Sequence, residues 1–304
     1  MTYYPITIPT LCRYEHFRRC VESLAKNTHA DKTELIIGLD YPLKDEHRKG
    51  YNKILEYLPT IYGFKTVTVF KREKNYGASA NNLALRAYAF SKYDACIFSE
   101  DDNEFSPCFL DFMNQALDRY KYEMKITSVS GFTTNKYYDL SDNVIFLHGT
   151  SAYGMGVWKH KEDYFQSIPY SYWENILTTK TKSWKLFLHC PGLFHMFETM
   201  INKKAKWGDV MRSCHQIEND LYQIAPHKSM VRNWGNDGSG LHCGDDNGKM
   251  HMQEIILDTT FALNEQKICN SIPWHITFLE HLPSDKLSQF RTIVRLFIKK
   301  FFHL

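Results

Sequence analysis

The chain has 304 residues, of which 43% are hydrophobic and 23% are charged, and its formal net charge is +3. These values are ordinary for a globular protein, and this length allows a substantial core. The net charge is too small to indicate a nucleic-acid partner, and outside the C-terminal residues there is no dense basic stripe with interleaved aromatic residues. We therefore expect no nucleic-acid binding.

Eight cysteines are scattered along the chain and form neither a CxxC pair nor a zinc-type spacing. This pattern is typical of a reducing cytoplasm, where cysteines pack as small hydrophobic residues. The N-terminal MTYYPITIPT lacks the features of a signal peptide, and no apolar stretch approaches the roughly 18 to 20 residues that span a bilayer. We expect a cytoplasmic protein, with peripheral contact on the inner face of the cell membrane as its one membrane association.

Strand and helix signals alternate over about the first hundred residues. Short apolar or β-branched runs predict strands, and apolar positions at helical spacing predict helices. The predicted strands are 6–8, 35–39, 66–70 and 95–98, and the predicted helices are 14–26, 46–58 and 77–90. This alternation predicts an α/β protein with a doubly wound, mostly parallel sheet.

The pattern loosens after residue 105. A helix is expected from about 107 to 121, and strands are expected near 126–131 and 143–147. Residues 149–250 are rich in Gly, Trp, His and Asn and have poor periodicity. We expect a long irregular segment there, and such segments inside compact domains are usually functional.

The C-terminal residues 284–304 predict a basic amphipathic helix. Apolar residues recur at spacings of three and four, and Arg291, Arg295 and Lys299 lie alongside at i, i+4. This is the form expected of a segment that lies on an anionic membrane surface. The alternatives are a helix docked on its own domain and a dimer seam. The apolar residues are Leu287, Phe290, Val294, Phe297, Phe301 and Leu304.

An acidic triplet, Glu100, Asp101 and Asp102, follows the last of the four predicted strands. Three consecutive carboxylates repel one another, so folding alone gives no reason for them. A divalent cation and a ligand rich in hydroxyls and phosphates would supply that reason, and ligands of open α/β sheets lie at this end of the strands. The alternative is a solvated turn before a helix, capped by Asn103 or Ser106.

Polar groups also follow the other predicted strands, at the same edge of the sheet. Arg13 can meet a diphosphate, and Asp40 can accept from a uracil N–H or a ribose hydroxyl. Each signal is weak alone, because an Asp after a strand is more often a turn former, but their order along the chain predicts a nucleotide-sugar site. The candidate residues at these strand ends are Pro9, Thr10, Arg13, Asp40, Asn75, Gly77 and Asn81.

At these positions the chain resembles the GT-A glycosyltransferases, specifically family 2-like bacterial enzymes and the inverting N-acetylglucosaminyltransferases. The resembling pieces are PTLCR at 9–13, NYGASANN at 75–82, SEDDNEFSP at 99–107, YGMGVW at 153–158, KWGDVMR at 206–212 and VRNWGNDGSGLHCG at 231–244. The resemblance implies a Rossmann-like GT-A fold with a smaller acceptor-side subregion. It implies one catalytic domain over 1–283, with a nucleotide-sugar half over about 1–105 and an acceptor half over about 106–283.

The resemblance also implies roles within the triplet. Glu100 and Asp101 would contact the nucleoside, and Asp102 would bind the Mn²⁺ or Mg²⁺ that bridges the diphosphate. Hard oxygen ligands suit both ions. His242 in GSGLHCG is a further candidate ligand of the metal or the diphosphate, although a lone His is more often structural.

KWGDVMR carries the implied mechanism. An inverting transfer needs a carboxylate that takes the proton from the attacking acceptor hydroxyl. Asp209 resembles the family's general base, and Gly208 departs from relatives that often carry a second acid there. An ordinary helix N-cap is the alternative for Asp209, and Glu218 and Asp220 are the other candidate bases.

Two glycines and two tryptophans complete the candidate residues. Gly154 and Gly156 resemble the loop beneath the donor sugar, where missing side chains allow close backbone approach, and a plain glycine turn is the alternative. Trp158 and Trp207 are assigned to acceptor binding, because a sugar can stack on an indole.

These features predict an inverting, metal-dependent glycosyltransferase that uses a UDP-sugar and a saccharide or lipid-linked acceptor in bacterial surface-polysaccharide or lipopolysaccharide synthesis. Uracil is favoured only by the habit of the family. One alternative is a sugar-phosphate nucleotidyltransferase, but such enzymes usually carry glycine after the first strand and PTLCRYEHFRR has none. The other is a non-catalytic carbohydrate-binding protein of GT-A type, which predicts an incomplete set of carboxylates.

Overall fold

The computed structural model describes residues 2–134, 144–235, 237–238, 253–257, 263, 267–283 and 285–302. The chain divides into two compact units. The first comprises residues 1–145, 151–164 and 224–267, and the second comprises residues 146–150, 165–223 and 268–304. The first unit thus takes in residues from both of the halves expected from the sequence.

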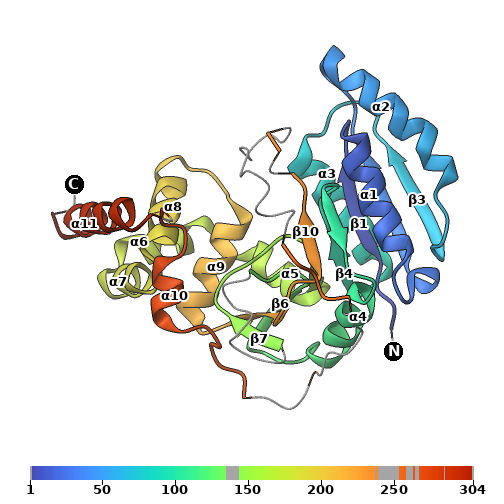
Figure 1. The fold of residues 1–304 in the computed structure, drawn as a ribbon. Helices are drawn as coiled ribbons and strands as arrows, with labels where there is room; N and C mark the ends of the chain where they lie inside the picture. The colour runs from blue at the N-terminus through green and yellow to red at the C-terminus, as the bar shows by residue number, and fades with distance from the viewer. Residues whose placement is uncertain are drawn as a thin grey trace. The chain divides into compact units, whose positions relative to one another are not determined.

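The main sheet of the described residues has eight strands in the order β3-β2-β1-β4-β8-β6-β9-β7 (Figure 1). Strands β3, β2, β1 and β4 are parallel to one another, and β8 is antiparallel to β4 and β6. The predicted α/β class and mostly parallel sheet are therefore confirmed. The strands are β1 Ile6–Thr10, β2 Glu34–Leu39, β3 Thr66–Lys71, β4 Ala95–Phe98, β6 Ile126–Ser130, β7 Val144–Leu147, β8 Met155–Trp158 and β9 Tyr222–Pro226.

Helices cover the parallel part of the sheet, and this explains why β2 and β4 are buried along their whole length. A parallel strand covered on both faces reads as a continuous apolar run. Helix α1 (Tyr14–Ala25) buries its apolar positions, and α3 (Ala78–Lys92) packs on β1, β2 and β4. Helix α4 (Phe109–Arg119) packs on β6 and β8. The other helices up to residue 167 are α2 Asp45–Tyr57 and α5 Lys159–Ser167, with short 3₁₀ turns at Ala30–Lys32 and Leu58–Thr60.

A small two-stranded ribbon follows the acidic triplet directly. Strand β5 (Asn103–Phe105) pairs antiparallel with β10 (Val231–Asn233), so that residues from distant parts of the chain lie side by side. The expectation of a turn capped by Asn103 or Ser106 is wrong here. Helix α4 begins only at Phe109, and its N-cap residue makes no side-chain cap hydrogen bond.

The second unit is helical, and the irregular segment expected over residues 149–250 is wrong for much of its length. Buried polar residues such as Ser213, His215 and Gln216 of α9 interrupt the apolar pattern, so no clear periodic stripe marks most of these helices in the sequence. Their aromatic and aliphatic side chains share one core, which includes Trp173, Phe187 and Phe197. The helices are α6 Tyr170–Thr178, α7 Lys180–His189, α8 Pro191–Asn202, α9 Gly208–Asn219, α10 Trp274–Leu279 and α11 Lys286–Phe302.

Helix α11 confirms the predicted C-terminal helix. Leu296 is buried in the core of the second unit, and Phe297 packs against the same core. None of the helices that the structure describes combines the length and the apolar character needed to cross a membrane.

Candidate functional site

Thr10, the last residue of β1, joins the ends of the two neighbouring strands. Its carbonyl oxygen accepts a hydrogen bond from the backbone N–H of Asp40 at 2.9 Å. Its hydroxyl donates to Oδ2 of Asp101 at 2.8 Å. The structure therefore brings together three of the residues that the sequence places at successive strand ends.

Arg13 lies between the two aspartates of the triplet. Its Nη2 pairs with Oδ1 of Asp101 and with Oδ2 of Asp102, the second at 2.8 Å. Asp101 is 6% exposed and Asp102 is 5% exposed, whereas Glu100 is exposed. The solvated-turn alternative is therefore wrong for both aspartates, and a guanidinium balances their charges.

This crowding shifts the protonation of the site. Burial raises the pKa of Asp101, the charge of Arg13 opposes that rise, and the neighbouring charge of Asp102 adds to it. Such a perturbed carboxylate at a strand end is the kind of group that functional sites gather.

Asp40 organises the start of α3. Its Oδ1 accepts from the backbone N–H groups of Tyr41 at 2.9 Å and Tyr76 at 2.8 Å, and its Oδ2 accepts from Gly77 at 2.9 Å. Nδ2 of Asn75 donates to the carbonyl oxygen of Tyr41 at 2.7 Å. Since a carboxylate oxygen has two lone pairs, Oδ2 of Asp40 can still accept from a ligand.

Asn81 is buried, and its side-chain amide serves the fold. Nδ2 donates to the carbonyl oxygen of Gly38 at 2.8 Å, and Oδ1 accepts from Nε of Arg72 at 3.0 Å. Pro9 lies within β1, opposite Gly38 of β2. These residues shape the strand ends beside Thr10 and Asp40.

Asn233 is a site residue that the sequence left unassigned. Its Nδ2 donates to Oδ1 of Asp102 at 2.8 Å and to Oδ1 of Asn103 at 3.0 Å. The only signal in the sequence was the run of glycines and amides in VRNWGNDGSGLHCG. That run indicates a loop of unusual geometry, but it does not name the strand with which the preceding residues pair.

Trp158 belongs to the core of the first unit. It is fully buried, and its Nε1 donates to the carbonyl oxygen of Leu117 at 2.9 Å. Nζ of Lys161 lies 3.9 Å from the centre of a ring of its indole. The indole has no exposed face on which a sugar can stack, so the structure does not support acceptor binding by Trp158.

Gly154 and Gly156 make room for side chains of the core. A Cβ on Gly154, whose φ is +64°, would lie 2.9 Å from the ring of Phe109. A Cβ on Gly156 would lie 2.8 Å from Cε of Met113. Both glycines therefore have a packing role that needs no donor sugar.

The two aspartates fit a hard divalent cation. Arg13 already serves as one cationic partner shared by both carboxylates. Mg²⁺ typically takes one or two protein carboxylates and completes its coordination with phosphate oxygens and water. No group of three or more His, Cys, Asp or Glu that could hold a metal is found among the described residues, and His242 lies outside them.

Asp209 lies in the second unit, in the first turn of α9, and its side chain is exposed. Trp207, not Asp209, is the N-cap residue of this helix, and its backbone N–H contacts Sδ of Met200 at 3.2 Å. A carboxylate in the first turn is favourable for the helix dipole. Asp209 therefore has a modest structural benefit and remains accessible to solvent.

The other two candidate bases have partners within the second unit. Oε1 of Glu218 pairs with Nζ of Lys182 at 3.3 Å. Asp220 accepts a hydrogen bond from the hydroxyl of Tyr222, and its Oδ1 lies 3.6 Å from Nε2 of His148. These contacts favour Asp209 among the three.

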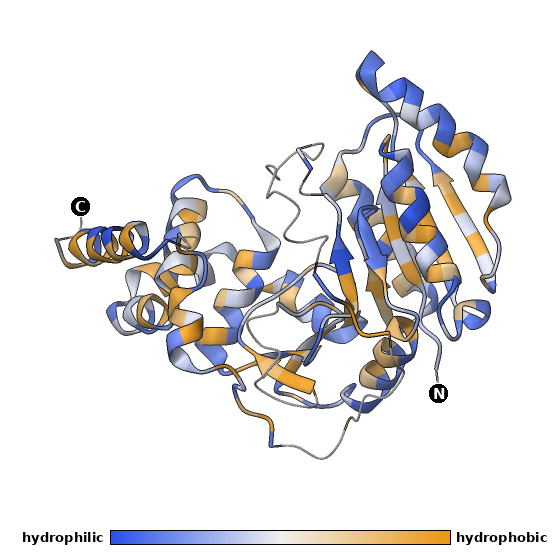
Figure 2. Ribbon diagram, in the orientation of Figure 1, coloured by the Kyte–Doolittle hydropathy of each residue, from blue (hydrophilic) through white to orange (hydrophobic). Residues whose placement is uncertain are grey.

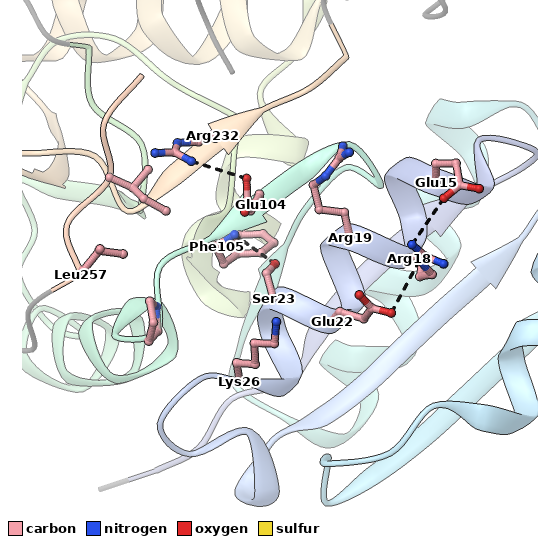
Figure 3. A pocket seen from close by; sticks show the side chains of 12 residues that line it. Glu15, Arg18, Arg19, Glu22, Ser23, Lys26, Glu104, Phe105, Arg232 and Leu257 are labelled. Atoms are coloured by element: carbon pink, nitrogen blue, oxygen red, sulfur yellow. Dashed lines mark hydrogen bonds and ion pairs between the residues drawn. The ribbon is translucent and has the colours of Figure 1, made fainter. Parts of the chain in front are cut away.

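A cavity of about 410 Å³ lies on the outer side of α1 (Figure 3). Arg19 and Glu22 of α1 line it together with Glu104 of β5 and Arg232 of β10. None of the site residues that the sequence predicted lines this cavity.

Residues 6–148, a little under half of the chain, match the family described as glycosyl transferase family 2. The match takes in Thr10, Arg13, Asp40 and the acidic triplet. No curated protein has a significant match to the chain.

Solved structures with a similar arrangement share little sequence with the chain. The similarity to S. aureus TarS 1-349 in complex with UDP has a TM-score of 0.41 and 13% identity, and covers 81% of this chain and 74% of that one. The similarity to the Pyrobaculum calidifontis mannosyltransferase PcManGT with GDP-Man and Mn²⁺ has a TM-score of 0.39 and 12% identity. It covers 55% of this chain and 47% of that one. The similarity to mouse xyloside xylosyltransferase 1 has a TM-score of 0.39 and 10% identity. It covers 72% of this chain and 83% of that one. The alignments with three further TarS structures span less than half of those chains.

Proposed function

We propose that the chain is an inverting, metal-dependent glycosyltransferase. It would transfer a sugar from a UDP-sugar to a saccharide or lipid-linked acceptor in bacterial surface-polysaccharide or lipopolysaccharide synthesis. The observation that carries this proposal is the buried network of Thr10, Arg13, Asp101 and Asp102 at the end of parallel strands, within a family 2 domain.

The residues of this network have distinct roles in the proposal. Asp102 would hold Mn²⁺ or Mg²⁺, and the ion would offset the charge that develops on the departing diphosphate. Asp101 beside it would lie on the nucleoside side. Arg13 is the nearest guanidinium to these carboxylates, and a guanidinium can bind a phosphate through two parallel hydrogen bonds. Oδ2 of Asp40 would accept from the nucleoside. Glu100, which is exposed beside the buried pair, would contact the nucleoside as well.

Asp209 is our candidate for the general base. Its exposed carboxylate can take the proton of an acceptor hydroxyl, a contribution typically of about 10²- to 10⁴-fold in rate. Its neighbour Trp207 is half-buried, so part of its indole remains available for an acceptor sugar. Both assignments rest on the resemblance of KWGDVMR to the family.

The test is a screen of nucleotide-sugars for hydrolysis and for thermal stabilisation of the full chain, with and without Mn²⁺. At least one nucleotide-sugar should raise the melting temperature, and the rise should need the metal. Asp102→Ala should abolish the metal-dependent rise. Asp209→Asn should retain the rise and lose about 10²- to 10⁴-fold in transfer. If no nucleotide-sugar binds or is turned over, the proposal is wrong.

A nucleotidyltransferase and a non-catalytic carbohydrate-binding protein are the competing functions. The first predicts release of pyrophosphate from a nucleoside triphosphate in the presence of a sugar 1-phosphate. The second predicts binding of a saccharide without nucleotide and without metal. The same screen, extended to these ligands, separates the three.

Helix α11 supports a further part of the proposal, contact with a membrane. Five apolar side chains at spacings of three and four form one face of the helix, and each is between 40% and 69% exposed. Apolar and hydrophilic residues alternate along α11 in Figure 2. The helix docks mainly through another side, since Leu296 is buried and Lys299 pairs with Glu198, although the ring of Phe301 also lies 5.8 Å from that of Trp184. The exposed residues are Leu287, Phe290, Val294, Ile298 and Phe301.

The charge of α11 selects the partner. Lys286, Arg291 and Arg295 are exposed, and the segment Lys286–Phe302 contains five basic residues and no acidic one. An exposed apolar stripe flanked by cations complements an anionic bilayer. We therefore propose peripheral contact with the inner face of the cell membrane, where a lipid-linked acceptor would be found.

Vesicle co-sedimentation tests this contact. The protein should bind vesicles of phosphatidylglycerol and phosphatidylcholine more strongly than vesicles of phosphatidylcholine alone. Phe290→Ser with Phe301→Ser should abolish binding, and Arg291→Ala with Arg295→Ala should remove the preference for anionic lipid. Tyr62→Ser, at an exposed position of the first unit, is the control. A dimer in solution that the double Phe variant dissolves would assign the stripe to a second copy instead.

A further inference from the structure

The segment Asn233–Gly235 lies directly on Asp102. Besides the amide of Asn233, the backbone N–H of Trp234 donates to the carbonyl oxygen of Asp102 at 2.8 Å. Oδ1 of Asn233 in turn accepts from the backbone N–H of Gly235 at 3.0 Å, which closes the turn. Asp102 is thus held at its side chain by the last residue of β10 and at its backbone by the residue that follows this strand.

The side chain of Trp234 is fixed at several points. Its Nε1 donates to Oε2 of Glu104 at 2.8 Å, and the guanidinium of Arg19 lies 3.9 Å from the centre of its ring. Its carbonyl oxygen accepts from Nε2 of His16 at 3.1 Å. Arg19 and Glu104 line the cavity on the outer side of α1 (Figure 3), so the indole is anchored outside the carboxylate site.

Gly235 is the point of closest approach to the carboxylate. A Cβ added there would lie 2.1 Å from Oδ2 and 2.9 Å from Cγ of Asp102. Contacts this short cannot be accommodated, so any side chain at this position must displace the carboxylate or the segment. Oδ2 is also the oxygen that pairs with Arg13.

A buried carboxylate beside another carboxylate needs such support. Repulsion between Asp101 and Asp102 favours rotation of Asp102 away from its neighbour. The hydrogen bonds of Asn233 and Trp234 and the close backbone of Gly235 oppose that rotation. A site held within about half an ångström of its productive geometry needs this kind of second layer.

We infer that Trp234 and Gly235 are positioning residues for Asp102. They fix the direction of its carboxylate from the side on which the segment Asn233–Gly235 lies. Neither residue needs to touch the donor. This inference rests on the proposed function, because it assigns the two residues to the metal and diphosphate side of the same site. The residues that the sequence predicts for this site do not include Trp234 or Gly235.

Binding of Mn²⁺ alone, and of UDP or GDP with Mn²⁺, tests the inference by calorimetry on the full chain. Gly235→Ala should weaken binding by tenfold or more. Gly208→Ala is the matched control, since a Cβ there meets no atom within 4 Å, and it should bind as the wild type does. Trp234→Phe keeps the ring beneath Arg19 and loses one hydrogen bond, so it should weaken binding by about fivefold.

Variants of Glu104 separate positioning from a general loss of structure. Glu104→Gln keeps an oxygen acceptor for the indole N–H and should bind metal and nucleotide as the wild type does. Glu104→Ala should weaken binding as Trp234→Phe does, with the melting temperature of the free protein nearly unchanged. If Gly235→Ala does not fold, these variants carry the test.

The outcomes separate the two proposals. Wild-type protein that binds neither Mn²⁺ nor a nucleotide would overturn the proposed function. Wild-type binding with equal affinity in Gly235→Ala and Trp234→Phe would overturn only the positioning role. Equal losses in Glu104→Gln and Glu104→Ala would also overturn it, because the hydrogen bond to Trp234 would then be irrelevant.

Discussion

The two units of the chain stabilise their polar groups in opposite ways. In the first unit, Asp101 and Asp102 are buried as charges and share Arg13 as a counter-ion. In the second, His148 is half-buried beside Tyr222, with ring centres 4.6 Å apart in a stacked arrangement, and no described hydrogen bond reaches its two buried ring nitrogens. The first arrangement depends on charge balance, and the second depends on a histidine that stays neutral.

The pKa values of the second unit express this difference. Burial, together with the charges of His189 and Lys185 and against the opposing charge of Asp220, lowers the pKa of His148 to about 4. Burial also lowers the pKa of His215 to about 4, with Arg212 adding to the effect. Acid should therefore destabilise the second unit through protonation of its histidines. Loss of the guanidinium of Arg13 should destabilise the first.

The largest expected effect is on the core of the second unit. Phe187→Ala removes a fully buried ring and should lower the free energy of unfolding by about 3 to 5 kcal/mol. Urea denaturation followed by tryptophan fluorescence measures it. Phe301→Ala, at a largely exposed position of the same unit, should cost less than about 1 kcal/mol. Equal costs would mean that α11 buries Phe301 in solution.

Removal of Arg13 should be almost as costly in the first unit. Arg13→Ala leaves two adjacent buried carboxylates without their shared cation, and this should cost about 3 kcal/mol in unfolding free energy. Adding Asp101→Asn should recover part of the loss, because it removes the repulsion. A double variant less stable than Arg13→Ala would show that Asp101 is stabilised by other groups.

The pH dependence of the free energy of unfolding should reveal the contribution of His148. Its pKa is about 4 in the folded chain and about 6.5 in an unfolded one, so the unfolded chain binds more protons between these values. The contribution of neutral His148 to the free energy of unfolding is fully present above pH 6.5. It is lost as the pH falls toward 4, and the loss reaches up to about 3 kcal/mol. Between about pH 7 and pH 4, the free energy of unfolding should fall by up to about 3 kcal/mol more in the wild type than in His148→Leu. His275→Leu, at an exposed position, should follow the wild type.

The smallest effect concerns one hydroxyl of the first unit. Thr10→Val removes the hydrogen bond to Asp101 and should cost about 1 to 2 kcal/mol, since the acceptor is charged. Thr7→Val, in the same strand, removes a buried hydroxyl that has no hydrogen-bond partner, so it should be neutral or stabilising. Chemical denaturation of the two variants compares them. Equal losses would contradict a role for the Thr10 hydroxyl.

Local sequence pattern predicted the parallel part of the fold well, because buried strands read as apolar runs and α1 and α3 have clear periods. Thr10, Arg13 and Asp101 were predictable for the same reason, since each follows such a run. Asn233 and Gly235 were not, because a three-residue strand such as β10 carries no periodicity that names its partner. The other helices of the second unit escaped prediction, unlike α11, because buried polar residues such as His215 and Gln216 of α9 interrupt the apolar pattern.

Asp102 and Asn233 lie 131 residues apart in the chain, and the residues 165–223 of the second unit come between them. During synthesis the ribosome must therefore deliver all of those helices before the acidic pair receives its last partners. At typical elongation rates this delay is on the order of ten seconds. Throughout it, the edge of β5 that pairs with β10 in the finished protein is open to other partners. Because slower synthesis lengthens this exposure, rapid completion of the chain should favour correct pairing of β5 with β10.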